Sequence, residues 1–223
     1  MLKLRTTAAS VALALLSVTS VAQGQQIVSA VGGVINSGGP GFGTLTETFD
    51  QSGLSANYVS GVTNFAAFLA GGPTHTPLFA GFEWFSNVGI SSASVTYDLG
   101  SVLNIKSLAL WNEESSGIGL LDLFASVDGV NFAALALGLV PNDNPRTDYG
   151  ADVFSFATTS LQYVRFDMDR CPQPNPGTQQ SCAIGEVAFE TGAGSVVPEP
   201  GTYALMLAGL AGLGIVARRR RAA

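Results

Sequence analysis

The sequence predicts an all-β fold, a β-sandwich of the jelly-roll type, between two terminal segments that are not part of the folded body. Short segments alternate apolar and polar residues, as half-buried strands do. Turn residues separate these segments at intervals of about ten residues, a spacing typical of sandwiches and jelly rolls. Charged residues make up only 12% of the chain, which leaves enough apolar residues for a sizeable core.

Four segments carry the strand pattern, at residues 44–49, 93–99, 120–127 and 162–168. In the fourth, Val164, Phe166 and Met168 fall on one face, because side chains alternate between the two faces of a strand. Arg165 and Asp167 fall on the other face. We predict that the apolar face is buried and that the charged face is solvated and holds an Arg–Asp pair.

Turn and cap residues predict one hairpin and one short helix. The Asp-Gly dipeptide at 128–129 is typical of a two-residue hairpin turn, since both positions tolerate a positive φ. Residues 65–70 are the helix candidate, with Thr63 or Asn64 as the N-terminal cap and Gly71 as the end.

The C-terminal segment combines an irregular turn, an apolar run and a basic end. Pro198 and Pro200 flank Glu199 and prevent regular structure, because proline lacks a backbone donor and restricts the residue before it. The apolar residues 202–217 would form a helix of about 24 Å, close to the thickness of a bilayer core. The arginines at 218–221 favour a cytoplasmic C-terminus. The sequence therefore predicts a membrane segment with the body outside.

This order of parts resembles the PEP-CTERM sorting signal of Gram-negative bacteria, whose members are processed by the membrane enzyme exosortase and handled alongside exopolysaccharide. The match rests on Val197, Pro198, Glu199 and Pro200, on the apolar run and on the arginines. The resemblance implies sorting and cleavage near this motif. An ordinary C-terminal anchor helix after a proline-rich linker is the alternative.

The N-terminal segment has the parts of a secretory signal peptide. Lys3 and Arg5 precede an apolar run at residues 8–16, and small residues at 20–22 suit signal peptidase. The sequence therefore predicts a signal peptide over residues 1–22. A permanent N-terminal membrane helix is the alternative.

The region between the two ends is acidic. From residue 23 through Glu199 the chain keeps four basic residues and all sixteen acidic ones, so the net charge of this stretch is −12, whereas the whole chain has −6. This sign makes nucleic acid an unsuitable partner, and it favours solubility and the attraction of divalent cations.

Cys171 and Cys182 are the two cysteines, and a loop rich in proline and glycine separates them. In an exported protein we expect a disulfide, and closing a loop of about 12 residues contributes about 3 kcal/mol. A zinc site is the alternative, but it needs two further ligands, and the one histidine, His75, is distant in sequence.

Four motifs occur in an order that carries a second resemblance. They are YDLG at 97–100, ASVDGVNF at 125–132, YVRF at 163–166 and IGEVAF at 184–189. In this order they resemble discoidin-like (F5/8 type C) domains, which are galactose-binding-like jelly-roll sandwiches. The resemblance implies this fold for the body, with ligand contacts in variable loops at one end.

Some galactose-binding-like domains hold a structural calcium between an early loop and the acid of the closing strand. By this resemblance Glu186 takes the second place, and Asn64 or the carbonyls near Thr63 take the first. Calcium binds six to eight oxygens. A glutamate that only faces water is the alternative, and no other cofactor is expected.

Trp111 and the two residues after it are the candidate ligand-binding residues. Sugar rings stack on exposed aromatic faces, and Asn112 and Glu113 offer hydrogen bonds to sugar hydroxyls. A tryptophan that fills the core at a strand end is the alternative. We expect Trp84 to be buried, and we expect His75 to be structural or to face solvent.

The chain offers little catalytic chemistry. A Ser-His-acid triad would require His75, and no G-x-S-x-G turn occurs. Sixteen acids leave a carboxylate pair for glycoside hydrolysis available, but no two of them stand out. We predict that the protein is not an enzyme, with a secreted hydrolase as the alternative.

Together these features divide the chain into a signal peptide (1–22), a discoidin-like domain (23–192), a linker with the sorting motif (193–200), a transmembrane helix (201–217) and a basic tail (218–223). We predict a noncatalytic protein of a Gram-negative bacterium, anchored in the inner membrane before processing and then placed at the cell surface or in the extracellular matrix. Its expected role is structural or adhesive, in association with exopolysaccharide. A carbohydrate-binding module is the alternative. Signal peptidase and exosortase are the expected processing partners.

Overall fold

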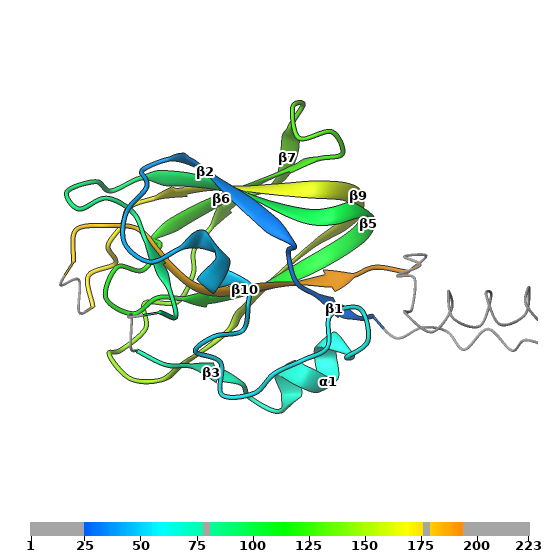
Figure 1. Cartoon of the computed structure of the whole chain (residues 1–223), viewed down its shortest axis with the longest axis horizontal. Coiled ribbons are helices and arrows are strands. Elements are labelled where there is room, and N and C mark those ends of the chain that lie inside the picture. Colours follow the sequence, from blue (N-terminus) through cyan, green and yellow to red (C-terminus); the bar gives the residue numbers. More distant parts are fainter. Residues whose placement is uncertain (1–24, 78–80, 176–178, 194–223) are drawn as a thin grey trace, which may run out of the picture.

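The computed structural model describes residues 25–77, 81–175 and 179–193. The predicted signal peptide (1–22), the sorting motif at 197–200 and the predicted transmembrane helix (201–217) lie outside these residues. Among the described residues, no helix is both long enough and apolar enough to cross a bilayer. They form a β-sandwich (Figure 1), as the sequence predicts.

Two long strands run through both layers of the sandwich. β5 (Ala93–Asn112) and β9 (Asp152–Asp169) pair in antiparallel fashion along most of their length. Their register shifts between Asp98 and Leu103 of β5, and Gly100 in this stretch has a φ of +79°. Because a Cβ makes this backbone conformation unfavourable, glycine suits the corner at which the strand passes from one layer to the other.

The first layer contains the N-terminal half of β5 and the C-terminal half of β9. Three further strands complete it: β2 (Gly32–Ser37), β6 (Leu120–Ser126) and β7 (Ala133–Leu139). β2 pairs with β5, β6 pairs with β9, and β7 pairs with β6. Figure 1 shows these strands in its upper half. The predicted strands at 93–99, 120–127 and 162–168 are therefore confirmed.

The second layer contains the C-terminal half of β5, the N-terminal half of β9 and three further strands: β1 (Ile27–Val28), β4 (Trp84–Phe85) and β10 (Ala183–Thr191). β10 pairs with β5, and both β1 and β4 pair with β10. Every residue of β10 is buried. Both faces of this strand are covered, because a further segment lies against the outer side of the second layer.

That covering segment contains the helix α1 (Phe65–Ala70) and the strand β3 (Thr74–His75), which lie beyond β10 in Figure 1. β3 pairs with the two-residue strand β8 (Tyr149–Gly150). The helix has the predicted bounds and cap, since Asn64 Oδ1 accepts a hydrogen bond from the Ala67 N–H at 2.8 Å. Phe65 packs in one buried cluster with Trp111 of β5.

The main core lies between the two layers. Tyr97 of β5 and Phe166 of β9 are both 0% exposed, and their rings meet edge to face with centroids 5.0 Å apart. Val164 and Met168 are buried on the same face of β9 as Phe166. Arg165 on the opposite face forms the predicted ion pair with Asp167, at 3.1 Å between Nε and Oδ1.

Residues 44–49 are not the strand that their alternation predicts. They contain a 3-10 helix, η1 (Leu45–Thr48). The Thr44 N–H donates to Oε2 of Glu47 at 3.0 Å, as in a helix capping box. The T-x-x-E order in this segment is therefore a helix-start signal, and it has the same alternating appearance as a strand.

The turn between β6 and β7 is longer than the predicted two residues, because the strands end at 126 and begin again at 133. Oδ1 of Asp128 accepts hydrogen bonds from the N–H groups of Val130 and Asn131. These bonds hold the turn in a compact loop at residues 127–132. Gly129 has the positive φ that the sequence indicates, +72°.

Cys171 and Cys182 form the predicted disulfide, with Cα atoms 5.0 Å apart. The disulfide joins the residues that follow β9 to the residue that precedes β10. Next to it, the Gln173 N–H donates to the Gly117 carbonyl at 3.0 Å. The loop between the cysteines is thus attached to the turn that follows β5.

Candidate functional site

Trp111 lies within β5 and is 0% exposed, so it has no free face for stacking on a sugar. Its Nε1–H donates to the Pro73 carbonyl at 3.0 Å, and the ring packs in the cluster beneath α1. The outer side of β5 is covered at this point, which the local sequence does not reveal. Trp111 therefore fills the core, and the structure removes the basis for the predicted stacking.

Asn112 is also 0% exposed, and its amide is saturated with hydrogen bonds. Oδ1 accepts from the Ile118 N–H at 2.8 Å, and Nδ2 donates to Gln173 Oε1 at 2.7 Å and to the Asn142 carbonyl at 2.9 Å. These bonds fix the turn after β5 against two neighbouring loops. Asn112 is a structural residue in this arrangement, because no polar atom of its amide is left for a ligand.

Glu113 is 1% exposed and begins a compact turn. Its carboxyl accepts hydrogen bonds from the Ser115 N–H at 2.9 Å, the Ser115 hydroxyl at 2.6 Å and the Ser116 N–H. The carboxyl group therefore points into the protein. The three predicted ligand residues do lie together, but in the interior at the end of β5.

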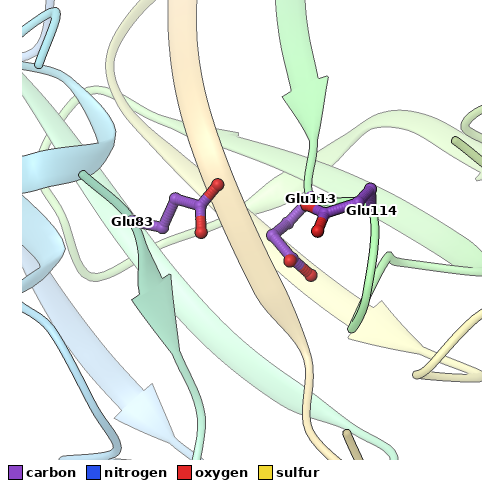
Figure 2. A group of neighbouring side chains, drawn as sticks. All are labelled: Glu83, Glu113 and Glu114. Atoms are coloured by element: carbon purple, nitrogen blue, oxygen red, sulfur yellow. The ribbon is translucent and has the colours of Figure 1, made fainter. Parts of the chain in front are cut away.

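The fold brings two further carboxyls to Glu113. Ligand oxygens of Glu83, Glu113 and Glu114 all lie within 4.8 Å of one another, and the three residues are 0, 1 and 3% exposed. Figure 2 shows Glu83 pointing toward the other two, which follow the end of β5. We call these residues the three-glutamate cluster.

His75 and Tyr149 bound this cluster on the side of β3 and β8. The Tyr149 hydroxyl donates to Oε1 of Glu83 at 2.7 Å and lies 3.0 Å from Nδ1 of His75. Nδ1 of His75 also lies 2.9 Å from the Thr76 carbonyl. Both residues are at most 3% exposed. His75 is therefore structural, which is one of its two predicted roles.

Burial sets the protonation of the cluster. It raises the pKa of Glu114 to about 8, and the neighbouring charge of Glu113 adds to this effect. Burial raises the pKa of Glu113 as well, against the hydrogen bonds from Ser115. The pKa of Tyr149 also lies well above its usual value, because the residue is buried and faces the charge of Glu83. The cluster resists carrying three negative charges at once.

Nothing in the local sequence connects Glu83 with Glu113. The pairing of β4 and β5 on the same strand β10 brings the two residues together. The one local signal is that Glu83 lies directly before a buried Trp-Phe pair. A carboxylate beside a predicted core residue indicates a buried acid, but it does not identify a partner.

The predicted calcium ligands Glu186 and Asn64 have different surroundings. Glu186 is 0% exposed, and its Oε2 accepts the Gln51 N–H at 3.1 Å. Its Oε1 has no partner among the described residues. Asn64 uses its oxygen to cap α1, so this oxygen is not free for an ion. The segment that faces Glu186 is the turn at Asp50 and Gln51, and Asn64 is not part of it.

A groove lies on the outer face of the first layer. It has a volume of about 670 Å³. The groove is lined by Val34 and Asn36 of β2, Ser94 and Thr96 of β5, Tyr163, Arg165 and Asp167 of β9, and Asp128 to Val130 and Phe132 of the β6–β7 loop. Three of these segments are strands, so the floor of the groove is rigid.

Arg165 lies on this face, against two aromatic rings. Its guanidinium carbon is 4.4 Å from the ring centre of Phe124 and 5.0 Å from that of Phe132. Such contacts contribute about 0.5–1 kcal/mol each where solvent reaches them. The side chain is 29% exposed, so the rings and Asp167 orient the guanidinium while part of it faces the groove.

The polar residues of the groove are linked to one another. Asn36 Nδ2 donates to the hydroxyls of Ser94 at 3.1 Å and Thr96 at 2.9 Å. The Ser94 hydroxyl donates to Oδ1 of Asp167 at 2.6 Å. Planar amide, carboxylate and guanidinium groups thus lie next to the aromatic rings of Tyr163 and Phe132. The alternation of β9 predicts that this strand face is solvated, and the groove lies on it.

Comparison with known proteins gives two independent results. Residues 196–221 match the family described as the PEP-CTERM protein-sorting motif. These residues lie outside the described structure, and the match agrees with the sorting signal at Val197 to Pro200. No curated protein matches the chain in sequence.

Solved structures similar to this chain include a selenomethionine-labelled variant of chitosan-binding module 1, derived from the chitosanase/glucanase of Paenibacillus sp. IK-5. It has a TM-score of 0.50 and 16% identity, over 74% of this chain and 98% of the module. A second is the module CpGH89CBM32-5 of Clostridium perfringens in complex with GalNAc-β-1,3-galactose, with a TM-score of 0.48 and 15% identity, over 71% and 93%. A third is the CBM32 of AlyQ in complex with 4,5-unsaturated mannuronic acid, with a TM-score of 0.44 and 15% identity, over 73% and 96%.

At 16% identity the likeness to the chitosan-binding module concerns the fold, and it agrees with the predicted jelly-roll β-sandwich. The chain thus carries a PEP-CTERM protein-sorting motif behind a β-sandwich body whose fold is similar to that of a chitosan-binding module.

Proposed function

We propose that the body is a noncatalytic, extracellular carbohydrate-binding module that holds a polysaccharide in the groove over β2, β5 and β9. The observation that carries this proposal is the position of Arg165, which packs against two phenylalanine rings and is partly exposed in the lining of an open groove. The chitosan-binding module with the same fold supports the ligand class only.

The chemistry of the groove suits a sugar chain. Sugar rings have apolar faces that pack on aromatic rings, and Phe132 and Tyr163 line the groove. Sugar hydroxyls both donate and accept hydrogen bonds, and Asn36, Asp167 and Arg165 supply both kinds of group. Because the groove is open, it suits a long chain better than an enclosed small molecule.

The three-glutamate cluster is not suited to glycoside hydrolysis in this structure. Its carboxyls are at most 3% exposed, so a glycosidic bond has no access to them. A hydrolase needs an acid and a base or nucleophile on either side of a bound sugar. We therefore propose that the polysaccharide binds in the groove. Through this binding the protein has a structural or adhesive role in the matrix.

A glycan array followed by calorimetric titration tests this proposal. We expect binding with Kd values between mM and µM, about −4 to −8 kcal/mol. Phe132→Ala and Arg165→Ala should each weaken binding about tenfold or more, which corresponds to about 1.4 kcal/mol. Binding that persists unchanged in both variants, or no glycan binding by the wild-type protein, would overturn the proposal.

Two matched variants control for general effects of these substitutions. Phe42→Ala removes a phenylalanine that is 54% exposed and lines a different cleft. Arg146→Ala removes an exposed arginine that does not line the groove, in the loop before β8. Both should leave glycan binding unchanged. If only Phe42→Ala loses glycan binding, the glycan-binding site is the cleft lined by Phe42 and not the groove.

The sorting motif supports export and membrane anchoring before processing. We propose that exosortase cleaves near Val197 to Pro200 and that the body then remains at the cell surface or in the extracellular matrix. Intact-mass spectrometry of the protein from its native host tests this. We expect a mature chain that ends near the motif, and we expect Glu199→Ala to retain the C-terminal arginines.

We also propose a structural calcium at Glu186. The support is one carboxylate oxygen, Oε1, that is buried and has no described partner, with Asp50 nearby. Burial and the Asp50 charge hold the pKa of Glu186 well above its usual value, and a cation would relieve both effects. Calorimetric titration should show one calcium fewer per chain in Glu186→Gln than in the wild type, with a smaller calcium-induced rise in melting temperature.

A further inference from the structure

We infer that Glu83, Glu113 and Glu114 form a second divalent-cation site, which takes calcium and joins the segment before β4 to the turn after β5. This site differs from the one at Glu186 in its residues and its place in the fold. It depends neither on sugar binding nor on the sorting of the chain.

The first support is geometric. Oxygens of the three carboxyls lie within 4.8 Å of one another. Two oxygens on opposite sides of one Ca²⁺, each at about 2.3–2.6 Å, lie about 5 Å apart, so the observed spacing accommodates one ion. Three carboxylates supply up to six oxygens, which reaches the lower end of the coordination number of calcium.

The second support is that the cluster contains unused acceptors. Oε2 of Glu83 and Oε2 of Glu114 are buried and accept no hydrogen bond from the described residues. Glu83 is 0% exposed and Glu114 is 3% exposed. A buried acceptor without a partner costs about 1–3 kcal/mol, more for a charged group, so two of them in one cluster indicate an absent donor or cation.

The third support is the lack of neutralising charge. In the described part of the chain, Lys106 pairs with Glu190 and Arg165 with Asp167, while Arg146 and Arg170 are exposed. The basic group near the cluster is His75, whose Nδ1 lies 3.4 Å from Oε1 of Glu83. One imidazole does not balance three carboxylates, and buried like charges repel strongly.

The donor set selects a hard cation. All the groups with free acceptor atoms are carboxylates, which suit calcium and magnesium and not the softer metals. His75 Nε2 is not directed at the cluster, since it lies against the backbone at Gly53. Magnesium requires near-ideal octahedral geometry and usually keeps several waters, which this buried position disfavours.

The ligands are already oriented for such an ion. The Ser115 and Ser116 N–H groups hold the Glu113 carboxyl, and the Tyr149 hydroxyl holds that of Glu83. Hydrogen bonds of this kind fix the direction of metal ligands in known sites. A bound ion would stiffen the turn at residues 113–119, which also contacts the loop of the disulfide.

Thermal melting and calorimetric titration of the chelator-treated, full-length protein with CaCl₂ test the inference. We expect calcium to raise the melting temperature of the wild type. Glu83→Gln and Glu114→Gln should each weaken calcium binding at this site tenfold or more. In the absence of calcium, both variants should melt at or above the wild-type temperature, because each replaces a carboxyl of a buried, crowded acidic cluster with a neutral amide.

Two further variants separate this site from other sources of calcium binding. Glu186→Gln should leave calcium binding at the three-glutamate cluster intact. Asp148→Asn makes a matching acid-to-amide change at an exposed position, and it should leave calcium binding at both sites intact. The inference is overturned if calcium has no effect on the wild type, if its effect is undiminished in Glu83→Gln and Glu114→Gln, if only Glu186→Gln reduces it, or if magnesium binds and calcium does not. If Glu83→Gln fails to fold, the calcium titration of Glu114→Gln tests the inference.

Discussion

The Tyr149 hydroxyl donates a 2.7 Å hydrogen bond to Oε1 of Glu83, and both residues are almost fully buried. The bond connects two segments that are 66 residues apart in sequence. It places a neutral donor against a buried carboxyl, and it fixes β8 against the residue that precedes β4.

Tyr149→Phe should lower the free energy of unfolding by about 1–3 kcal/mol, because it leaves Oε1 of Glu83 buried without its donor. Chemical denaturation measures this directly. The ring remains in place, so the packing beneath α1 is retained. An unchanged midpoint of denaturation would contradict the role of this bond.

Trp111→Ala should lower the free energy of unfolding by about 3–5 kcal/mol, since it removes a fully buried indole. Trp111→Phe is milder, because it keeps an aromatic ring and loses the bond to the Pro73 carbonyl. The folded Trp111→Phe protein should bind glycans as the wild type does. Loss of glycan binding at unchanged stability would restore Trp111 as a ligand residue.

Gly185→Ala should destabilise the protein by about 1–3 kcal/mol through overpacking. A Cβ at this position of β10 would meet the Tyr149 hydroxyl and lie 3.1 Å from the Trp111 carbonyl oxygen. Gly150→Ala is the matched control, since a Cβ there meets no heavy atom within 4 Å. Equal melting temperatures for the two variants would disprove the close approach at Gly185.

Replacing Cys171 and Cys182 by alanine should lower the free energy of unfolding by about 3 kcal/mol, because the disulfide closes a short loop in the unfolded chain. The cysteines are 11 residues apart. Wild-type protein treated with reductant should melt at the temperature of the double variant. The double variant should not respond to reductant, and a response would indicate an unrelated effect of the reagent.

Asp128 should make the stability of the β6–β7 loop depend on pH. Hydrogen bonds from Asn131 and Val130 hold the pKa of this carboxyl far below its usual value. Its stabilising effect is therefore complete above the pKa of the unfolded chain, about 3.9, and is lost as the pH falls through the folded pKa. The difference in melting temperature between wild type and Asp128→Asn should shrink below about pH 4. A difference that grows on acidification would contradict this assignment.

Features that depend on neighbouring residues could be predicted from the sequence. The strands at 93–99, 120–127 and 162–168 follow from alternation, because that pattern is set by the pleat of a single strand. The helix at 65–70 follows from its own cap, and the disulfide follows from the presence of two cysteines. The sorting motif is likewise a contiguous signal.

Local patterns were misleading where two structures share one pattern. Residues 44–49 alternate as a strand does, but the bond between Thr44 and Glu47 starts a 3-10 helix. Trp111 stands next to a polar turn, as a surface aromatic would. Its burial depends on α1 and β3 covering the second layer, and those segments are separated from it in sequence.

The groove and the three-glutamate cluster arise only in the folded protein. The groove combines β2, β5, β9 and the β6–β7 loop, so its residues are neighbours only after antiparallel pairing. Glu83 meets Glu113 and Glu114 because β4 and β5 pair with the same strand. Periodicity determines which face of a strand is apolar, whereas the proximity of distant acids depends on register and strand order, which no local pattern encodes.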